Sequence, residues 1–260
     1  MTKTIPLLNK IISFLETKFP KDLAYDWDNV GLQVGDANKQ VRKVIVALDA
    51  TLDVIKIAID EKVDLIITHH PLIFSPLSNI DYQTVLGQKL SLLIKKDIAL
   101  YTMHTNYDIA DGGMNDLFAR KYNLKNVEIL CSDGLGRIGE LDKKITLKEL
   151  AKVGINPDFL GVSPKAKAII GEESAQVSKV AIIAGSGGKY IHEAKNAGAD
   201  VLITGDVTYH SAVDAKEIGL AIIDVGHFAE NLMEDHVAEM LSKEFFKISI
   251  SSGVSTNPFS

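Results

Sequence analysis

The chain has 260 residues, 46% of them hydrophobic and 24% charged, so it is long enough for two modest domains or one large one. Its formal net charge of −6 is spread along the chain, which argues against an electrostatic grip on nucleic acid. No apolar run approaches the roughly 20 residues that cross a bilayer. The single cysteine, Cys131, excludes an internal disulfide, and we therefore expect a soluble cytoplasmic protein.

The first segment, MTKTIPLLNKIISFLETKFP, is predicted to form an amphipathic helix. Lys10 and Glu16 interrupt its apolar residues and no small-residue cleavage site follows, which argues against a signal peptide. The next segment, YDWDNVGLQVGD, joins Trp27 to acidic and amide side chains. We expect Asp28 and Asn29 to shape a turn ahead of the first strand.

Two stretches of the chain align without a gap. KVIVALDATLDVIKIAIDEKVDLIITHHP, from Lys43, matches KVAIIAGSGGKYIHEAKNAGADVLITGDV, from Lys179. Each copy has the pattern of a strand, a helix and a second strand, and Gly198 marks the end of the second helix. The unbroken runs LIIT and VLIT are typical of parallel strands buried on both faces. We therefore predict an internal repeat of α/β units.

The similarity extends into a third strand, where IALYTMHTNYD (98–108) can be laid over LAIIDVGHFAE (220–230). The predicted fold class is α/β, with two pseudo-symmetric halves facing a cleft that holds a dinuclear metal site. Residues 1–130 form the first half, and residues 131–260 form a bridging segment plus the second half. Residues 131–175, the bridging segment, are expected to complete one sheet or to connect the halves.

Histidines cluster at the predicted carboxyl ends of these strands, where α/β sheets bind ligands. The histidines at strand ends are His69, His70, His104, His210 and His227. His192 and His236 fall on helical patterns instead. A histidine pair before a proline can simply cap a strand, but convergence from four strand ends favours a metal site, since histidine is the commonest metal ligand.

Neighbouring side chains on an extended chain diverge, so His69 and His70 are suited to hold one ion each of a closely spaced pair. Asp108 and Glu230 can supply carboxylate oxygens, and His227 a further nitrogen. Such a shell suits two divalent ions of zinc, iron, manganese or nickel without choosing among them. His104 and His210 are candidate catalytic residues that orient ligands or transfer protons, or else are ordinary buried histidines.

Two further features have competing interpretations. Gly185, Gly187 and Gly188 in AGSGGKYIHEA either cradle a phosphate at a helix N-terminus or make a tight turn from strand to helix. The segment lacks both the dinucleotide pattern and the Walker spacing. Cys131 has no local partner in VEILCSDG, and we interpret it as a structural or surface thiol.

The motifs WDNVGLQVGD, DLIITHHPLIF, MHTNYD, GLGRIGEL, GSGG, LITGD and GHFAEN occur in this order and resemble the Nif-three-like family of dinuclear-metal proteins. The resemblance runs from about Trp27 to the closing STNPFS. It implies two similar α/β domains, a ring-shaped homohexamer with inward-facing metal pairs, and the ligands His69, His70, Asp108, His227 and Glu230. Some relatives place the last acid four residues after the histidine, whereas Glu230 follows His227 by three.

Family members are known as GTP cyclohydrolase I type 2 homologues, which implies attack of a metal-activated water on a nucleotide ring. His104 or His210 would then protonate the ring nitrogen. A two-metal centre suits phosphoester cleavage equally, and a non-catalytic metal-binding or interaction protein is a third hypothesis. The expected partners are a second copy of the chain and a small molecule such as a nucleotide, without a membrane.

Overall fold

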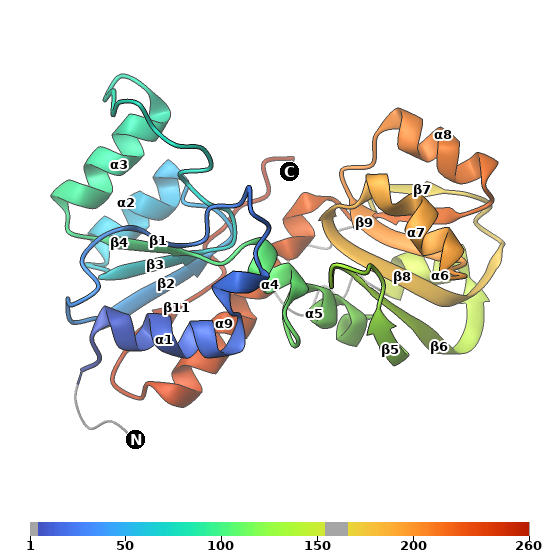
Figure 1. The fold of residues 1–260 in the computed structure, drawn as a ribbon, viewed down its shortest axis with the longest axis horizontal. Helices are drawn as coiled ribbons and strands as arrows, with labels where there is room; N and C mark the ends of the chain where they lie inside the picture. The colour runs from blue at the N-terminus through green and yellow to red at the C-terminus, as the bar shows by residue number, and fades with distance from the viewer. Residues whose placement is uncertain (1–4, 154–165, 260) are drawn as a thin grey trace. The chain divides into compact units, whose positions relative to one another are not determined.

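The computed structural model describes residues 5–153 and 166–259. The chain divides into two compact units (Figure 1): unit 1 is Met1–Ala110 with Asn231–Ser260, and unit 2 is Asp111–Glu230. This division differs from the boundary at residue 130 that the sequence suggested, because the end of the chain returns to the first sheet. Residues 154–165 of the expected bridging segment lie outside the described residues.

Unit 1 is a sheet with helices on both faces. Its elements are α1 (Leu8–Lys18), η1 (Lys21–Leu23), β1 (Gly31–Val34), β2 (Lys43–Ala47), α2 (Leu52–Asp60), β3 (Leu65–Thr68), α3 (Val85–Lys95), β4 (Ala99–Thr102), α4 (Thr105–Ile109), α9 (Leu232–Glu244) and β11 (Ser249–Ser251). In the described part of this unit, five strands lie in the order β1-β4-β3-β2-β11, and only β1 runs antiparallel to its neighbour. Figure 1 shows α2 and α3 on one face of the sheet and α1 and α9 on the other.

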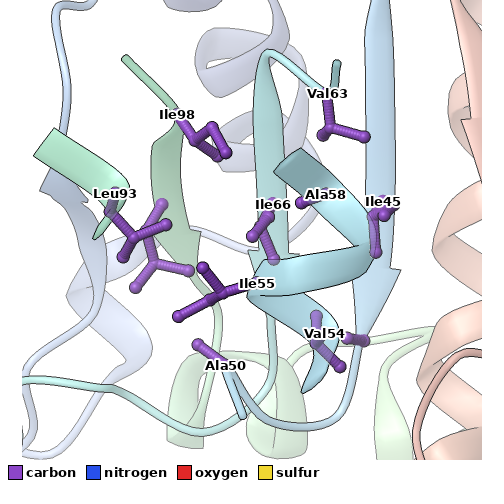
Figure 2. Close-up of a cluster of buried hydrophobic side chains, with 11 residues drawn as sticks. Ile45, Ala50, Val54, Ile55, Ala58, Val63, Ile66, Leu93 and Ile98 are labelled. Atoms are coloured by element: carbon purple, nitrogen blue, oxygen red, sulfur yellow. The ribbon is translucent and has the colours of Figure 1, made fainter. Parts of the chain in front are cut away.

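The face under α2 and α3 is closed by aliphatic side chains (Figure 2). Ile45 and Ile66 from the sheet pack with Val54 and Ile55 from α2, and all four are essentially inaccessible to solvent. Burying a side chain of this size contributes about 1.5–3 kcal/mol. This packing explains why the first three residues of LIIT are aliphatic: β3 is covered on both faces, and each of its residues is buried.

The last segment of the chain completes unit 1. β11 pairs in parallel with β2, and α9 packs against the same strand. Glu234 of α9 is 1% exposed. Its carboxylate accepts backbone N–H bonds from Leu48 at 3.2 Å, Gly253 at 2.7 Å and Val254 at 3.1 Å. A single buried carboxylate therefore ties the chain end to the loop after β2.

Unit 2 is a second mixed sheet. Its elements are α5 (Met114–Lys121), β5 (Lys125–Ile129), β6 (Arg137–Thr146), α6 (Leu147–Val153), β7 (Ala168–Ile170), β8 (Gln176–Ser186), η3 (Gly188–Tyr190), α7 (Ile191–Asn196), β9 (Val201–Gly205), α8 (Tyr209–Glu217), β10 (Ala221–Asp224) and η4 (His227–Asn231). Six strands of its described part lie in the order β5-β6-β8-β9-β10-β7, with β8, β9 and β10 parallel. α5 packs on β6 and β8.

Unit 2 also contains a buried ion pair. Arg137 of β6 is 3% exposed, and its guanidinium donates to both carboxylate oxygens of Asp116 at 2.7 and 3.1 Å. The same group donates to the carbonyls of Gly134 at 3.1 Å and Gly136 at 2.9 Å. The charge is thus paired and hydrogen-bonded, as a buried cation requires.

Strands β2, β3 and β4 of unit 1 are joined in the same register as β8, β9 and β10 of unit 2. Val44 pairs with Leu65 in unit 1, and Val180 pairs with Val201 in unit 2. Leu65 pairs in turn with Ala99, and Val201 with Ala221. These pairs are the ones expected if the aligned residues of the two sequence stretches occupy the same positions in their sheets.

Two details outside the strands also match. The carboxylate of Asp64 accepts from the amides of residues 42 and 43, and that of Asp200 accepts from the amides of residues 178 and 179. Gly35 and Gly171 have φ of +116° and +121°. A Cβ on Gly35 would contact the Cβ of Ala99, which begins β4, and a Cβ on Gly171 would contact the Cβ of Ala221, which begins β10. Glycine is required there by both the φ angle and the close approach.

None of the helices in residues 5–153 and 166–259 combines the length and the apolar character needed to cross a membrane. The cytoplasmic location stays a prediction.

Candidate metal centre

In unit 1, the neighbouring parallel strands β3 and β4 end side by side. Thr68, the last residue of β3, lies beside Thr102, the last residue of β4, and their hydroxyls are 3.0 Å apart. His69 and His70 follow the first of these strands, and His104 follows the second after one residue. The parallel register therefore brings these three imidazoles to the same place.

The three rings form a compact group. The ring centroids of His69 and His70 are 4.9 Å apart, and that of His104 lies 5.2 and 5.7 Å from them. One ring nitrogen from each lies within 4.8 Å of the others, an arrangement that can hold a metal ion. The structure thus places His104, predicted as a catalytic residue, among the predicted ligands.

Each of these histidines has its Nδ1 hydrogen-bonded to an acceptor. The acceptor is the Met103 carbonyl for His69, an Asp49 carboxylate oxygen for His70 and an Asp28 carboxylate oxygen for His104, each at 2.9 Å. A carbonyl or carboxylate can only accept, so the proton of each neutral imidazole is on Nδ1 and the lone pair on Nε2. Metal-binding histidines are typically held in this way.

His69 also faces an acid. Its Nε2 lies 3.6 Å from the Oδ1 of Asp108 in α4, and the histidine side chain is fully buried. Because Nδ1 already donates to Met103, a neutral His69 turns its Nε2 lone pair toward a carboxylate. This juxtaposition is repulsive unless a cation, either a proton or a metal ion, lies between the two atoms.

Unit 2 repeats this arrangement with different residues. His227 begins η4, and its Nδ1 lies 2.6 Å from the Oδ2 of Asp206, the residue that follows β9. Its Nε2 lies 3.1 Å from the Oε2 of Glu230, three residues later. The imidazole thus sits between two carboxylates, and a neutral ring can donate to only one of them. Glu230 is 2% exposed, so a carboxylate at this position needs a hydrogen-bond donor or a cation beside it.

The glycines of GSGG make room for this acid. A Cβ on Gly185, which has φ +65°, would lie 2.6 Å from the Oε1 of Glu230. The amide of Gly187 donates to the hydroxyl of Thr204 at 2.8 Å, and that hydroxyl donates to the carbonyl of Gly185 at 3.0 Å. These contacts account for the glycines as a tight turn, and the helix that follows has only six residues.

The remaining predicted residues lie elsewhere. His210 is in the first turn of α8, exposed to solvent, with its ring against that of Tyr209. His192 is exposed on α7. Cys131 is buried, and its burial, with Asp133 and Glu193 nearby, raises the pKa of the thiol to about 11. A thiol with that pKa is a poor nucleophile, in agreement with the structural interpretation.

The family model of Duf34/NIF3 (NGG1p interacting factor 3) matches residues 6–258 of the chain. A GTP cyclohydrolase 1 type 2 homolog from Clostridium perfringens is 42% identical over 227 residues, which cover 85% of each chain. This chain belongs to the Duf34/NIF3 family. A relative with the same name from Methanocaldococcus jannaschii is 41% identical over 85% of this chain and 88% of its own.

Solved structures of family members share the fold. A Bacillus cereus protein related to NIF3 superposes with a TM-score of 0.91 at 30% identity, covering 99% of this chain and 100% of its own. Reduced HcgD from Methanocaldococcus jannaschii superposes with a TM-score of 0.83 at 37% identity, covering 95% and 98%. The predicted family and the mixed α/β class with two sheets are confirmed.

Three residues of the site were not predicted from the sequence. They are Asp28, Asp49 and Asp206, the carboxylates that accept from His104, His70 and His227. The sequence offered a weak signal for two of them, because Asp49 and Asp206 follow the apolar runs of β2 and β9. Asp28 carries no such signal, since it lies 76 residues before the histidine it contacts.

Asp28 is the most strongly held of these acids. Its side chain is inaccessible to solvent, and it accepts from His104 Nδ1, from the Thr105 amide at 3.0 Å and from the Thr105 hydroxyl at 2.5 Å. Burial by itself raises the pKa of this carboxyl, but the hydrogen bonds from His104 and Thr105 outweigh it and lower the pKa to about 2.

The low pKa of Asp28 predicts a specific acid sensitivity. Its folded-state pKa of about 2 lies below the ordinary 3.8, so its contribution to stability is present above pH 3.8 and is lost as the pH falls through 2. The shift corresponds to about 2 kcal/mol. Urea unfolding of EDTA-treated protein should show Asp28→Asn destabilised at pH 5, with the gap from wild type closing by about that amount toward pH 2.

The matched control is Asp53→Asn, at a side chain that is 84% exposed. Its unfolding free energy should follow that of the wild type across the same range. A constant gap between wild type and Asp28→Asn from pH 5 to pH 2 would contradict the assignment.

Proposed function

We propose that this chain is a metal-dependent hydrolase that holds two divalent ions through His69, His70, Asp108, His227 and Glu230. One observation in each unit carries the proposal. In unit 1 the Nε2 of His69 faces Asp108, and in unit 2 the Nε2 of His227 faces Glu230, while the Nδ1 of each ring is taken by an oxygen acceptor. A cation held by the nitrogen and the oxygen would stabilise each pair.

The donor set supports a transition metal or zinc. Imidazole nitrogen with carboxylate oxygen suits zinc, iron, manganese and nickel, whereas magnesium and calcium prefer oxygen alone. We propose further that His69 and His70 bind different ions, because their Nδ1 atoms are anchored to acceptors on different strand ends, Met103 after β4 and Asp49 after β2.

The proposal of hydrolysis rests on the relatives, which carry the name GTP cyclohydrolase 1 type 2 homolog. A bound divalent ion lowers the pKa of a coordinated water to about 7, which supplies hydroxide at neutral pH. His104 is suited to transfer a proton to a substrate nitrogen, because Asp28 accepts from its Nδ1 and orients the ring. The catalytic role of His210 stays a prediction.

A ring-shaped substrate is supported by an aromatic platform beside His104. Trp27 is 57% exposed, yet its ring is stacked on that of Tyr25 at 5.6 Å and meets those of Phe74 and His104 at 5.9 and 6.1 Å. The chain is held on both sides of Trp27, since Asp28 accepts from Thr105 and the Tyr25 amide donates to the Thr105 hydroxyl at 3.2 Å. Stacking of a base on such a ring contributes about 1–3 kcal/mol.

The test combines metal analysis with turnover. Purified protein should contain two divalent ions per chain, and chelation should abolish hydrolysis of a guanine nucleotide, which one of the four candidate metals should restore. Because Trp27 is the single tryptophan, binding of the nucleotide should quench the fluorescence of the protein. Turnover of phosphoesters without a ring would instead indicate a phosphoesterase. Tight metal binding without turnover of either class would indicate a non-catalytic metal-binding protein.

We also propose a ring-shaped homohexamer, an inference from the family resemblance alone. Light scattering at micromolar concentration should give about six times the chain mass of 28.3 kDa. A monomer or an isolated dimer would contradict it.

The two units are proposed to be copies of one ancestral unit. Support comes from the matching strand register, from Asp64 and Asp200 on matching amides, and from Gly35 and Gly171. In a crystal structure, β2–β4 and β8–β10 should superpose with the aligned residues coincident. A shift of one residue in any of these strands would contradict the repeat.

A further inference from the structure

Asp206 and His227 form a close contact within unit 2. The Asp206 Oδ2 accepts from His227 Nδ1 at 2.6 Å and from the Ser186 hydroxyl at 3.1 Å. The two side chains are 38% and 35% exposed. An ordinary surface ion pair of this exposure contributes little to stability, so stability alone does not explain the contact.

The backbone around Asp206 is built for this contact at some cost. Asp206 has φ +50°, in the left-handed region that disfavours residues other than glycine. The neighbouring Gly205 lies very close to the segment that leads into η4. A Cβ on Gly205 would be 2.9 Å from Gly226 C and 3.0 Å from His227 N. The end of β9 is thereby pressed against the start of η4, with the Asp206 carboxylate directed at the imidazole.

The contact determines which ring nitrogen of His227 carries the proton. A proton held on Nδ1 by Asp206 leaves the lone pair on Nε2, which lies 3.1 Å from Glu230. Without the carboxylate, the ring can adopt the other tautomer, which puts the proton on Nε2, or it can rotate, which moves Nε2 away from Glu230. Either change removes the Nε2 lone pair from its position beside Glu230.

We propose that Asp206 is a positioning residue that fixes the tautomer and orientation of His227, so that Nε2 and Glu230 together present a preformed pair of metal ligands. This inference rests on the proposed metal centre. In the aligned copy, position 206 corresponds to His70, whose own Nδ1 is held by Asp49. The first copy thus places a proposed ligand where the second places the group that holds one.

The test uses the left-handed backbone of Asp206 to separate positioning from stability. Asp206→Gly removes the carboxylate and relieves φ, so metal-free protein should melt at the same temperature or higher. The same variant should bind Zn²⁺, measured by competition with a chelator, about 10–100-fold more weakly at the ion held by His227. Asp206→Asn tolerates this φ and keeps an oxygen acceptor, so its loss should be smaller.

Two comparisons complete the experiment. Lys62 has φ +57°, and Lys62→Gly should change stability in the same direction as Asp206→Gly while leaving Zn²⁺ affinity unchanged. In a His227→Ala background, Asp206→Gly should weaken Zn²⁺ binding no further, because the carboxylate acts through the imidazole.

The outcomes are distinct. Wild-type Zn²⁺ affinity in Asp206→Gly would overturn the positioning role and leave the metal centre standing, as would an equal loss of affinity in the His227→Ala background. Failure of the wild-type protein itself to bind Zn²⁺ would overturn the proposed metal centre and this role with it.

Discussion

The double variant His69→Ala, His70→Ala is expected to lose nearly all of its bound metal, and each single variant to lose part of it. Substituting a group that only supports a ligand typically weakens metal affinity by about 10–100-fold, and removing two proposed ligands should exceed that. Metal content per chain, measured by elemental analysis after dialysis against a metal-buffered solution, checks the result. The variants should also melt at a lower temperature in the presence of metal, because an ion bound only by the folded chain stabilises it by mass action.

The control for this experiment is His192→Ala. His192 is exposed on α7 and belongs to none of the possible metal-ligand groups among the described residues, so its removal should leave the metal content unchanged. Full metal occupancy in the double variant would refute the assignment. The histidine pair would then have only the structural role of ending a strand.

Arg137→Ala is expected to lower the free energy of unfolding of unit 2 by about 3–5 kcal/mol. The substitution leaves the carboxylate of Asp116 and the carbonyls of Gly134 and Gly136 without the guanidinium that they share. Arg137→Lys keeps the charge but loses the two parallel bonds to Asp116, so it should be destabilised as well, though less. Chemical unfolding followed by circular dichroism measures the effect.

An exposed pair provides the matched control. Lys243 and Glu239 lie one turn apart on α9, with side chains that are 73% and 67% exposed, and their charged atoms are 2.6 Å apart. Lys243→Ala should leave the free energy of unfolding nearly unchanged, because exposed ion pairs contribute little. Equal effects of Arg137→Ala and Lys243→Ala would show that burial does not determine the strength of the Arg137 pair.

Sequence patterns predicted the buried framework well, because it depends on local periodicity. LIIT and VLIT are strands buried on both faces, and the aligned stretches give strands and helices at matching places. The strand-end rule placed His69, His70 and His104 together, and the structure groups them within unit 1. The family resemblance was confirmed by the match over residues 6–258.

The features that sequence patterns did not predict depend on distant contacts. Asp28 looks like a turn residue in the sequence, and only the folded chain brings it to a histidine 76 positions later. His210 follows an apolar strand as His70 does, yet it lies exposed on α8 because Thr208 begins that helix by accepting the amide of Ser211. The return of β11 to β2 has no local signal, since three residues of a short edge strand carry little pattern.

The division of unit 1 into two separated segments has a consequence for how the protein is made. A ribosome synthesises residues 1–110 first, then all of unit 2, and only at the end the segment that supplies α9 and β11. Unit 2 is continuous in sequence and can fold as soon as it leaves the ribosome. Until β11 and α9 are made, the sheet of unit 1 has an uncovered edge at β2, and the Leu48 amide cannot donate to Glu234. A chain truncated before residue 231 should therefore expose a sheet edge that attracts chaperones or other strands. Synthesis of the segment from Asn231 onward would therefore determine when the edge of β2 becomes covered.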